Sequence, residues 1–389
     1  MPNVNLLARC GACLALLVNL LPGPAPAATL IVGPEAPSMT LAEALGKAVD
    51  GDTVALMPGN YRGQTGVVTQ KQLTIRAVAE RPVLEATGRV AERKAILVVR
   101  GGDVTIENLE FRGARADDAN GAGIRHETGR LTVRNSQFFD NEVGILTGND
   151  ANAELVVEDS EFGLAPRVEG GLHHLLYVGR IARFSVRGSR FYSGFEGHLI
   201  KSRARESRIT YNLIHDGEEG QASYEIDLPN GGLAWVIGNV IGQGDEAQNP
   251  VMVAYGSEGN AWPKNGLYVS HNTFVGTPWP PSWFLRVFAD RLPDGTEVKV
   301  VNNVTLGLGL LSPGTKGEFS GNVWAFRRRA VNSIYTLDFT PTEASGWRGQ
   351  AQPAGQGGGT SLQPTAQFKL PRGTRPIQPP AAWSPGAVQ

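Results

Sequence analysis

The segments VTIENLEF (104–111), LTVRNSQF (131–138), LVVEDSEF (155–162) and FSVRGSRF (184–191) are four copies of one pattern. In each copy, apolar and polar residues alternate as in a half-buried strand, and a small or polar residue and a closing Phe follow. The pattern continues in more varied form further along the chain, in RITYNLI (208–214), WVIGNVI (235–241), YVSHNTF (268–274) and KVVNNVT (299–305). The chain is therefore built from repeats.

The spacing of these repeats predicts the fold. The closing residues lie at positions 111, 138, 162, 191, 214, 241, 274 and 305, so successive copies are 27, 24, 29, 23, 27, 33 and 31 residues apart. Such a period, with strand-like alternation and no helical pattern between copies, is typical of a parallel β-helix. The handedness of crossovers between parallel strands favours a right-handed coil. We expect an all-β, single-stranded right-handed parallel β-helix over residues 29–335.

The two ends of the repeat region are predicted to differ. TLAEALGKAV (40–49) has helical spacing and is expected to be a cap helix that covers the open N-terminal end. Residues 336–389 are rich in Pro, Gly and Gln and lack the repeat. This composition predicts an extended C-terminal tail that packs along the β-helix or is in part disordered.

One polar position inside the later repeats is always asparagine. The residues at this position are Asn212, Asn239, Asn272, Asn303 and Asn322. Stacked amides at an inward-facing turn can hydrogen-bond from coil to coil, which satisfies buried polar groups. We interpret this series as a structural asparagine ladder rather than a catalytic site.

The N-terminus is predicted to be an export signal. Arg9 precedes an apolar stretch, CGACLALLVNLL (10–21), and small residues in PAPAA (24–28) suit cleavage near Ala27 or Ala28. The apolar stretch is short for a membrane span, although a retained N-terminal anchor is the alternative. Residues 1–28 are therefore expected to be a signal peptide of a periplasmic or secreted protein with no membrane span after its removal.

The composition and the net charge argue against several kinds of site and partner. Both cysteines, Cys10 and Cys13, lie inside the predicted signal peptide, so the mature protein would have no disulfide and no thiolate metal site. The 389 residues carry a net charge of -1, which does not point to nucleic acid or to an anionic membrane as a partner. A monomer is expected.

A second strand is predicted in each coil, and its register brings distant residues together. The segments are AGIRHE (122–127), VGILTG (143–148), LLYVGR (175–180), HLIKSR (198–203), EIDLPN (225–230), VMVAYG (251–256) and FLRVFA (284–289). Ile145, Leu176, Ile200 and Ile226 are placed in the core. Because side chains alternate and coils stack about 4.8 Å apart, Leu146, Tyr177, Lys201 and Asp227 should then form an outward-facing column.

The residues two positions from this column extend it into a polar patch of Tyr177, Lys201, Arg203, Glu225 and Asp227. This combination could cleave a uronate-containing polysaccharide by β-elimination, which needs a base, an acid and a partner for the carboxylate. Lys201 is the candidate base, Arg203 the candidate carboxylate clamp and Tyr177 the candidate acid or base. Glu225 and Asp227 oppose a neutral lysine unless they hold Ca²⁺. The alternative is a cross-coil lattice of salt bridges without catalysis.

Histidine and tryptophan residues near this patch are candidates for binding the sugar. His174 precedes the strand of Tyr177 and His198 precedes that of Lys201, so either could contact substrate. The adjacent residues His173 and His174 could also bind a metal ion together, but adjacent side chains of a strand point to opposite faces, which does not suit a shared metal. Three tryptophans in turn segments could stack on pyranose rings, or could pack those segments on the β-helix: Trp262, Trp279 and Trp283.

The repeat region resembles right-handed parallel β-helix proteins of the pectate-lyase-like class. More narrowly, IKS (200–202) followed by Asn212 is similar to the lysine coil of chondroitinase B and the alginate lyases of polysaccharide lyase family six. That resemblance implies Lys201 as the base and calcium as the partner of the uronate, but Asp227 stands where the family has an arginine. IKSRA and IDLPNGG together also resemble segments of uncharacterised exported β-helix proteins, which implies a fold and no reaction.

Two hypotheses of function follow from these observations. The first is an exported lyase that cleaves an acidic polysaccharide on an outer face of the β-helix. The second is a non-catalytic glycan-binding or structural β-helix protein. The two differ in whether the polar patch around Lys201 turns substrate over or only retains it.

Overall fold

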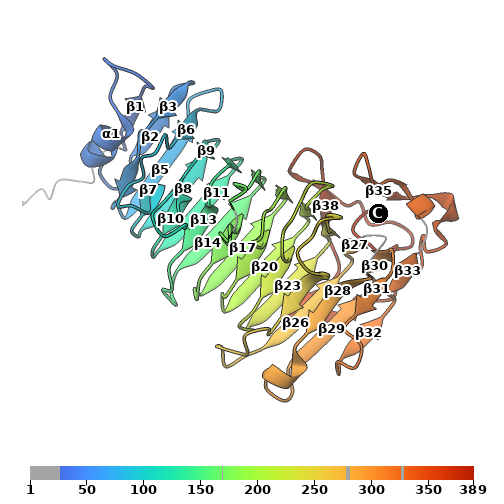
Figure 1. The fold of residues 1–389 in the computed structure, drawn as a ribbon. Helices are drawn as coiled ribbons and strands as arrows, with labels where there is room; N and C mark the ends of the chain where they lie inside the picture. Colours follow the sequence, from blue (N-terminus) through green and yellow to red (C-terminus); the bar gives the residue numbers. More distant parts are fainter. Residues whose placement is uncertain (1–26, 169, 277–280, 326–327) are drawn as a thin grey trace, which may run out of the picture.

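The chain winds into a parallel β-helix, coil upon coil, from the N-terminal to the C-terminal end (Figure 1). The computed structural model describes residues 27–168, 170–276, 281–325 and 328–389. Within these residues, three long sheets with parallel neighbouring strands form the walls of the coil, and strands predominate over a single short α-helix. The predicted all-β solenoid with an N-terminal cap helix is confirmed. The predicted signal peptide lies outside the described residues, apart from its last two positions.

Each wall takes one strand from each coil. Sheet A consists of β1 (Thr29–Val32), β2 (Thr53–Leu56), β5 (Gln72–Ala77), β8 (Asp103–Glu107), β11 (Arg130–Arg134), β14 (Glu154–Glu158), β17 (Arg183–Arg187), β20 (Glu206–Thr210), β23 (Leu233–Ile237), β26 (Gly266–Ser270), β29 (Glu297–Val301) and β32 (Glu318–Ser320). Sheet B consists of β3 (Asn60–Arg62), β6 (Val83–Glu85), β9 (Glu110–Arg112), β12 (Gln137–Phe139), β15 (Glu161–Gly163), β18 (Arg190–Tyr192), β21 (Leu213–His215), β24 (Val240–Gly242), β27 (Thr273–Val275), β30 (Val304–Leu306) and β33 (Val323–Ala325). Sheet C consists of β4 (Gly66–Val68), β7 (Ala95–Val99), β10 (Ala122–His126), β13 (Val143–Thr147), β16 (Leu176–Val178), β19 (Ile200–Ser202), β22 (Ile226–Leu228), β25 (Val251–Tyr255), β28 (Ser282–Val287) and β31 (Gly309–Leu311).

The repeat segments that decide the fold each supply two strands, not one. In VTIENLEF, β8 of sheet A ends before Asn108 and β9 of sheet B contains the closing Phe111. Asn108 has a φ of 58°, in the left-handed region, and this turns the chain from one sheet into the next. Asn135 and Asp159 have φ values of 46° and 48° at the same position of the following coils. Asn and Asp tolerate this conformation better than most residues, which explains the polar position in the pattern.

The closing residues form the centre of the core. The rings of Phe111, Phe138, Phe162 and Phe191 are stacked in successive coils, with centroids 5.1, 4.6 and 4.8 Å apart. All four side chains are buried. Stacking of identical residues therefore fixes the register of sheet B from coil to coil.

The asparagine ladder is confirmed. The side-chain amide of Asn212 donates to Asn239 Oδ1 at 2.9 Å, that of Asn239 to Asn272 Oδ1 at 3.0 Å, and that of Asn272 to Asn303 Oδ1 at 2.9 Å. The amide of Asn303 donates to Asn322 Oδ1 at 2.9 Å. Each amide is thus satisfied inside the turn, as buried polar groups require.

The N-terminal end of the coil is covered by the single α-helix, α1 (Leu41–Lys47). Thr40 and Glu43 form a capping box, and Leu41, Ala44 and Leu45 are buried against the first coil. No helix in the described residues is long and apolar enough to span a membrane.

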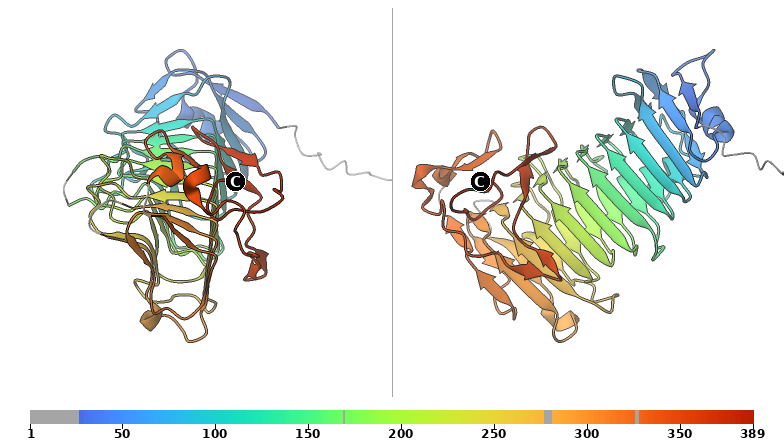
Figure 2. Two further views of the ribbon diagram at one scale, coloured as in Figure 1. Left: turned by 90° about the vertical axis from the view of Figure 1, so that its right-hand side faces the viewer. Right: turned by 180° about the vertical axis from the view of Figure 1, so that it is seen from behind.

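The C-terminal segment runs back along the outside of the coils (Figure 2). It contains three two-stranded hairpins, formed by β34 (Val331–Ser333) and β35 (Asp338–Pro341), β36 (Gln356–Gly357) and β37 (Thr360–Ser361), and β38 (Ala366–Phe368) and β39 (Thr374–Pro376). Within the described residues, short 3₁₀ helices lie between β28 and β29, at η1 (Ala289–Arg291), and near the hairpin of β34 and β35, at η2 (Arg328–Ala330) and η3 (Glu343–Ser345). The segment packs on sheet A, where the Trp235 indole N–H donates to Gly357 O at 3.0 Å. It also packs on sheet B, where Phe339 and Trp347 lie in one apolar cluster with Val240.

Candidate functional site

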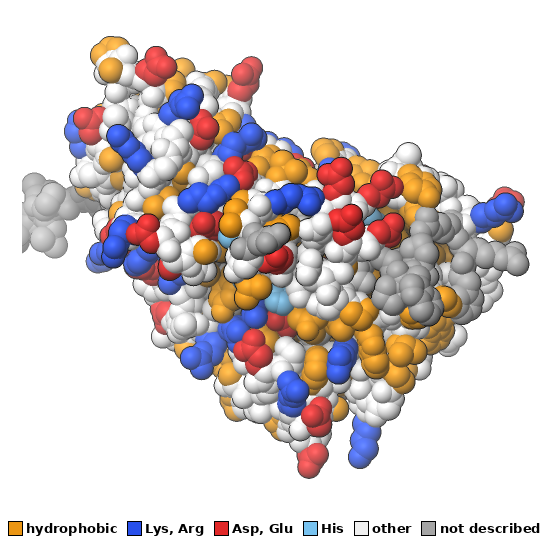
Figure 3. Space-filling model, viewed as in Figure 1, with side chains coloured by type: hydrophobic (Ala, Val, Ile, Leu, Met, Phe, Trp, Pro, Cys, Tyr) orange, Lys and Arg blue, Asp and Glu red, His pale blue; other side chains and the backbone are white. Residues whose placement is uncertain are grey.

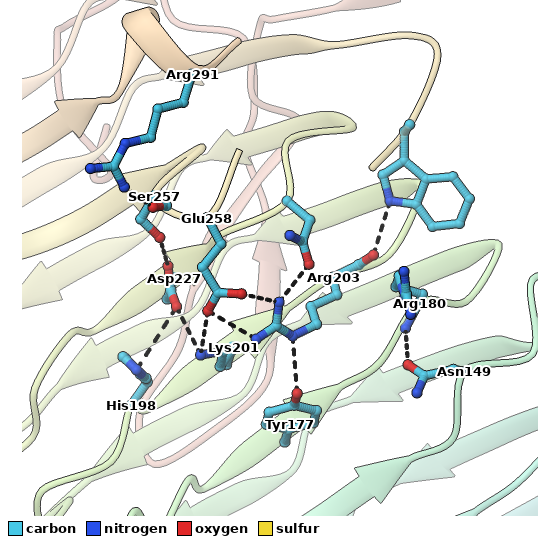
Figure 4. Close-up of polar contacts among 12 residues, drawn as sticks. Asn149, Tyr177, Arg180, His198, Lys201, Arg203, Asp227, Ser257, Glu258 and Arg291 are labelled. Atoms are coloured by element: carbon cyan, nitrogen blue, oxygen red, sulfur yellow. Dashed lines mark hydrogen bonds and ion pairs between the residues drawn. The ribbon is translucent and has the colours of Figure 1, made fainter. Parts of the chain in front are cut away.

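A column of outward-facing side chains crosses the middle of sheet C. Tyr177 on β16 pairs with Lys201 on β19, and Lys201 pairs with Asp227 on β22. Leu176 and Ile200, which precede Tyr177 and Lys201, are completely buried. The predicted register of this column is therefore confirmed, and Figure 4 shows the three side chains together on one face.

Arg203 lies beside this column, just after the end of β19, and binds three different partners. Its Nε donates to Tyr177 Oη at 3.0 Å, and its Nη1 donates to Asn230 Oδ1 at 2.5 Å. The two Nη atoms also donate to the two carboxylate oxygens of Glu258, at 2.5 and 2.9 Å. Burial alone would lower the pKa of Arg203, but the hydrogen bonds to Glu258 and Tyr177 outweigh it and raise the pKa. The guanidinium is thus a fixed, fully charged fork.

Lys201 lies between two carboxylates. Its Nζ is 3.4 Å from Asp227 Oδ2 and 3.4 Å from Glu258 Oε1. The same amine is 6.0 Å from the centroid of the Tyr177 ring. The lysine is therefore held at the floor of the patch, at a position from which a proton could be transferred to or from a bound sugar.

Asp227 lies beside Lys201 in the next coil, where the surrounding side chains bury it almost completely. Ser257 Oγ donates to Asp227 Oδ1 at 3.2 Å. Burial raises the pKa of Asp227 to about 6, although the ammonium of Lys201 opposes this rise. Protonation of this carboxyl would therefore change the charge beside Lys201 within a physiological range of pH.

An aromatic stack borders the column. The rings of His174 and His198 lie 4.8 Å apart, and the rings of His198 and Tyr224 lie 4.7 Å apart. The backbone N–H of His198 donates to His174 Nδ1 at 2.9 Å, and His198 Nε2 is 3.8 Å from Asp227 Oδ2. Burial lowers the pKa of His174 to about 3 and that of His198 well below its usual value, so both rings are neutral. Both predicted histidines thus border the patch, His198 beside Asp227 and His174 beside the Tyr177 ring, with ring centroids 5.3 Å apart.

Glu225 does not lie on the outer face where we expected it. The strand β22 begins at Ile226, so the alternation that places Asp227 outward does not extend back to Glu225. Its side chain is completely buried and turns into the core beside Asp216. Burial, and next the charge of Asp216, raise the pKa of Glu225 well above its ordinary value, which favours the protonated form.

The residues present do not form the expected calcium site. Glu225 is enclosed in the core, and Asp227 is already bound by Lys201 and Ser257. Among the described residues, no group of three or more His, Cys, Asp or Glu side chains could hold a metal ion. We therefore derive no step of a reaction through calcium.

The tryptophans are placed differently from one another. The indole N–H of Trp262 donates to the backbone oxygen of Arg203 at 3.0 Å, so this ring borders the patch. Trp283 lies on β28 of the same sheet, where it is half-buried and under the Arg286 guanidinium. Trp279 lies outside the described residues.

Three residues of the patch were not predicted from the sequence. Asn230 and Glu258 bind Arg203, and Ser257 binds Asp227. Ser257 and Glu258 lie in the turn after β25, the next strand of the sheet after the one that carries Asp227. The polar segment GSEGN (256–260) after this strand could have indicated these residues, because turns on one side of a solenoid lie close together and this turn therefore lies near the patch.

Charged side chains of both signs lie on the surface of the molecule. Figure 3 shows one face, on which acidic and basic side chains lie among apolar ones. A separate cavity of about 520 Å³ lies near the ends of sheet B strands, and its lining includes Arg190 with Glu218, Glu219 and Asp245. Its excess of acidic side chains suits an anionic sugar less well than the Arg203 fork does.

The comparisons with known proteins agree with the fold. No protein-family model matches the sequence, and no curated protein matches it. Among solved structures, the crystal structure of pectate lyase Pel9A is similar, with a TM-score of 0.60 and 14% sequence identity, over 86% of this chain and 95% of that chain. A likeness at this level of identity shows the fold alone: the chain and that pectate lyase share the architecture of a parallel β-helix.

Proposed function

We propose that the protein is a polysaccharide lyase that cleaves an acidic, uronate-containing glycan by β-elimination on the outer face of sheet C. The observation that supports this proposal is the close grouping of the Arg203 fork, the Lys201 amine and the Tyr177 hydroxyl. β-Elimination needs these three kinds of group within reach of one sugar ring. The fold of a pectate lyase adds support by analogy.

The chemistry assigns one role to each group. Arg203 holds the uronate carboxylate and stabilises the negative charge that develops on it as the C5 proton leaves. Lys201, as the neutral amine, takes the C5 proton, the C4–C5 double bond forms, and the C4–oxygen bond breaks. Tyr177 gives its phenolic proton to the leaving oxygen, and the proton that Lys201 took then returns to the Tyr177 phenolate through water. Trp262 and Trp283 provide apolar ring surfaces for neighbouring sugars, and His198 borders the reacting ring.

We further propose that the protein acts outside the cytoplasm as a monomer, in the periplasm or after secretion. The apolar segment at residues 10–21 followed by small residues supports export. A polysaccharide substrate is too large to reach a cytoplasmic enzyme without transport, so export also agrees with the proposed reaction.

A non-catalytic glycan-binding protein is the second candidate. One observation favours it: the Lys201 amine lies 3.4 Å from each of two carboxylates, which stabilise its protonated, non-basic form. In this case the patch would retain an acidic glycan without cleaving it, and the tryptophans would supply most of the affinity.

The decisive experiment compares turnover with retention. The mature protein is incubated with pectate, alginate, glycosaminoglycans and bacterial exopolysaccharides, with and without Ca²⁺, and the ultraviolet absorbance of the unsaturated uronate product is followed. We expect absorbance to rise on at least one of these glycans and to be lost in Lys201→Ala. Retention on an acidic glycan column with no absorbance change on any substrate would instead favour the binding protein. Full activity of Lys201→Ala would remove the assignment of the base.

A further inference from the structure

The carboxylate of Glu258 lies on the Arg203 guanidinium, at the position that the proposed mechanism assigns to the carboxylate of the substrate. Its two oxygens accept hydrogen bonds from the two Nη atoms of Arg203, at 2.5 and 2.9 Å, in the side-by-side geometry typical of an arginine–carboxylate pair. One of the same oxygens is 3.4 Å from Lys201 Nζ. The patch is therefore already organised around one carboxylate, and that carboxylate belongs to the protein (Figure 4).

The burial of these side chains shows which of them is free to leave. The side chain of Glu258 is 45% exposed, whereas those of Arg203 and Lys201 are 18% and 12% exposed. The two cations thus form the floor of the patch, and Glu258 covers them from the solvent side. Its departure would open the floor to an incoming anion.

The main chain at Glu258 is fixed, so a rotation of its side chain is sufficient for this departure. The backbone N–H of Glu258 donates to Pro229 O at 2.9 Å, and Gly259 N–H donates to Gly256 O at 3.0 Å. Arg203 keeps its own position through Tyr177 and Asn230 when Glu258 leaves. The fork therefore stays oriented toward the solvent.

We propose that Glu258 is an internal occupant of a carboxylate-binding subsite, and that the carboxylate of a glycan replaces it on Arg203 and Lys201. This inference rests on the proposed function and names the group that the site selects. A sugar without a carboxylate cannot replace the two hydrogen bonds and the ion pair that Glu258 gives up, so neutral glycans are rejected. Glu258 is thus a specificity-determining residue that the substrate must displace.

The charges of the surrounding groups agree with such an exchange. Without Glu258, the patch retains the cations of Lys201 and Arg203 against the single carboxyl of Asp227. The neighbouring rings of His174 and His198 are neutral and do not change the net positive charge of the patch. A ligand carboxylate therefore meets an excess of positive charge at the floor of the patch once the side chain of Glu258 has turned out.

The test measures binding rather than cleavage. The dissociation constants of D-glucuronate and D-galacturonate, with glucose as the neutral probe, are measured by calorimetry at neutral pH for the wild-type protein, Glu258→Ala, Glu258→Gln and Glu107→Ala. Glu107 is an exposed residue at the end of β8 on sheet A, so its variant removes the same charge from another face. Circular dichroism and thermal unfolding verify that each variant is folded.

We expect Glu258→Ala to bind both uronates about tenfold or more tightly than the wild type, because ligand binding no longer competes with an internal pair. Glu258→Gln should give a smaller gain, since its amide still occupies the fork without a charge, and glucose binding should not change. A gain in a folded Glu258 variant that is absent from Glu107→Ala, and that disappears in the double variant Glu258→Ala/Arg203→Ala, supports the inference. Unchanged or weaker uronate binding in both folded Glu258 variants, or an equal gain in Glu107→Ala, overturns it. A gain in binding without cleavage of any glycan would keep the inference and remove the lyase, whereas cleavage without a gain in binding would do the reverse.

Discussion

Glu225 occupies the place in the core of one coil that Leu199 occupies in the coil before it. Ile200 pairs with Ile226, so the residues that precede these two follow each other through the interior. Leu199 and Glu225 are both completely buried. The two carboxyl oxygens of Glu225 have no hydrogen-bond partner within the described part of the chain. A carboxyl group without a partner, among apolar residues stacked through the core, lowers the stability of the fold.

Replacement of Glu225 by methionine should therefore stabilise the protein. Met252 is the next residue of the same stack, which shows that the core accepts a methionine here. At pH 8 we expect the free energy of unfolding to rise by about 1–3 kcal/mol, the usual cost of burying a polar group without a partner. Chemical unfolding followed by circular dichroism measures the change.

The pH dependence of this gain follows from the direction of the pKa shift. The pKa of Glu225 is raised in the folded protein above its ordinary value of 4.5. Between these two pKa values the folded form holds the proton while the unfolded chain releases it, so the contribution of Glu225 to stability is most favourable below pH 4.5 and is lost as the pH rises through the folded pKa. The advantage of Glu225→Met should accordingly be larger at pH 8 than at pH 4.5. An equal advantage at both values, or a loss of stability at pH 8, would contradict this account. Glu225→Gln, which cannot ionise, is the control for the proton.

Arg203→Lys tests the geometry of the carboxylate clamp. Lysine keeps the charge but has no planar fork, so it cannot bind Tyr177, Asn230 and a carboxylate together. On the substrate identified by the glycan assay, we expect KM to rise about 10- to 100-fold, which corresponds to about 1.4–2.8 kcal/mol of binding. Arg134→Lys, an exposed position on sheet A that pairs with Glu158, is the matched control and should leave KM unchanged. Equal KM values for Arg203→Lys and the wild type would show that the fork does not hold the substrate.

Asp227→Asn tests the coupling between the buried acid and Lys201. Above pH 6 the carboxylate of Asp227, whose pKa is raised to about 6, attracts the proton on the Lys201 amine 3.4 Å away. Asparagine removes this attraction and keeps the size of the side chain. We expect the rising limb of the profile of kcat/KM against pH to move to lower pH. A limb that stays in place, measured on protein with an unchanged unfolding curve, would mean that the base of the reaction is not coupled to Asp227.

Asn239→Ala tests the asparagine ladder as a source of stability. Asn239 accepts hydrogen bonds from both the backbone and the side-chain amide of Asn212, and donates to Ile209 O and Asn272 Oδ1. Alanine leaves these buried groups without partners, and we expect a loss of about 2–4 kcal/mol in the free energy of unfolding. Asn60→Ala, at an exposed asparagine that binds Glu85, should cost much less. Equal losses in the two variants would indicate that the ladder is not a special source of stability.

Most of the fold and part of the site could be predicted from the sequence, and the regular repeat of the coils is the reason in both cases. A solenoid repeats its register, so the alternation around Ile200 and Ile226 was sufficient to bring Tyr177, Lys201 and Asp227 into one column. The same regularity identified the asparagine ladder. Residues inside a strand are thus predictable because their neighbours are the equivalent residues of the next coil.

The residues that were missed or misplaced lie where the regular pattern ends. Glu225 precedes its strand by one residue, so alternation gave it the wrong side. Ser257, Glu258 and Asn230 lie in turns, whose side-chain directions depend on local backbone conformation that no periodicity encodes. The pattern also could not show that a protein carboxylate would occupy the arginine fork, because the turn with Glu258 belongs to a coil two strands further along sheet C than Arg203.

Gly357 is a point of close contact between the C-terminal segment and sheet A, and it gives the last prediction. The backbone oxygen of Gly357 accepts the hydrogen bond of the Trp235 indole, which is stacked on Tyr268 with ring centroids 5.4 Å apart. A Cβ atom on Gly357 would lie 2.1 Å from Tyr268 Cδ1, and Tyr268 is buried and cannot move aside. A side chain at this position must therefore lift the segment away from the sheet.

We expect Gly357→Leu to release the segment locally while the coils stay folded. Backbone amides of the segment near β36 and β37 should exchange hydrogen for deuterium at least about tenfold faster than in the wild type, and the fluorescence of Trp235 should shift toward that of an exposed indole. The amides of β2, β5 and β8, at the other end of sheet A, should keep their protection. Gln356→Ala changes the exposed neighbour without adding a side chain at the contact, and should behave like the wild type. If Gly357→Leu left the exchange of the segment unchanged, the contact with Trp235 and Tyr268 would not be what holds it; if it unfolded the coils as well, the segment would be part of one cooperative unit with the β-helix.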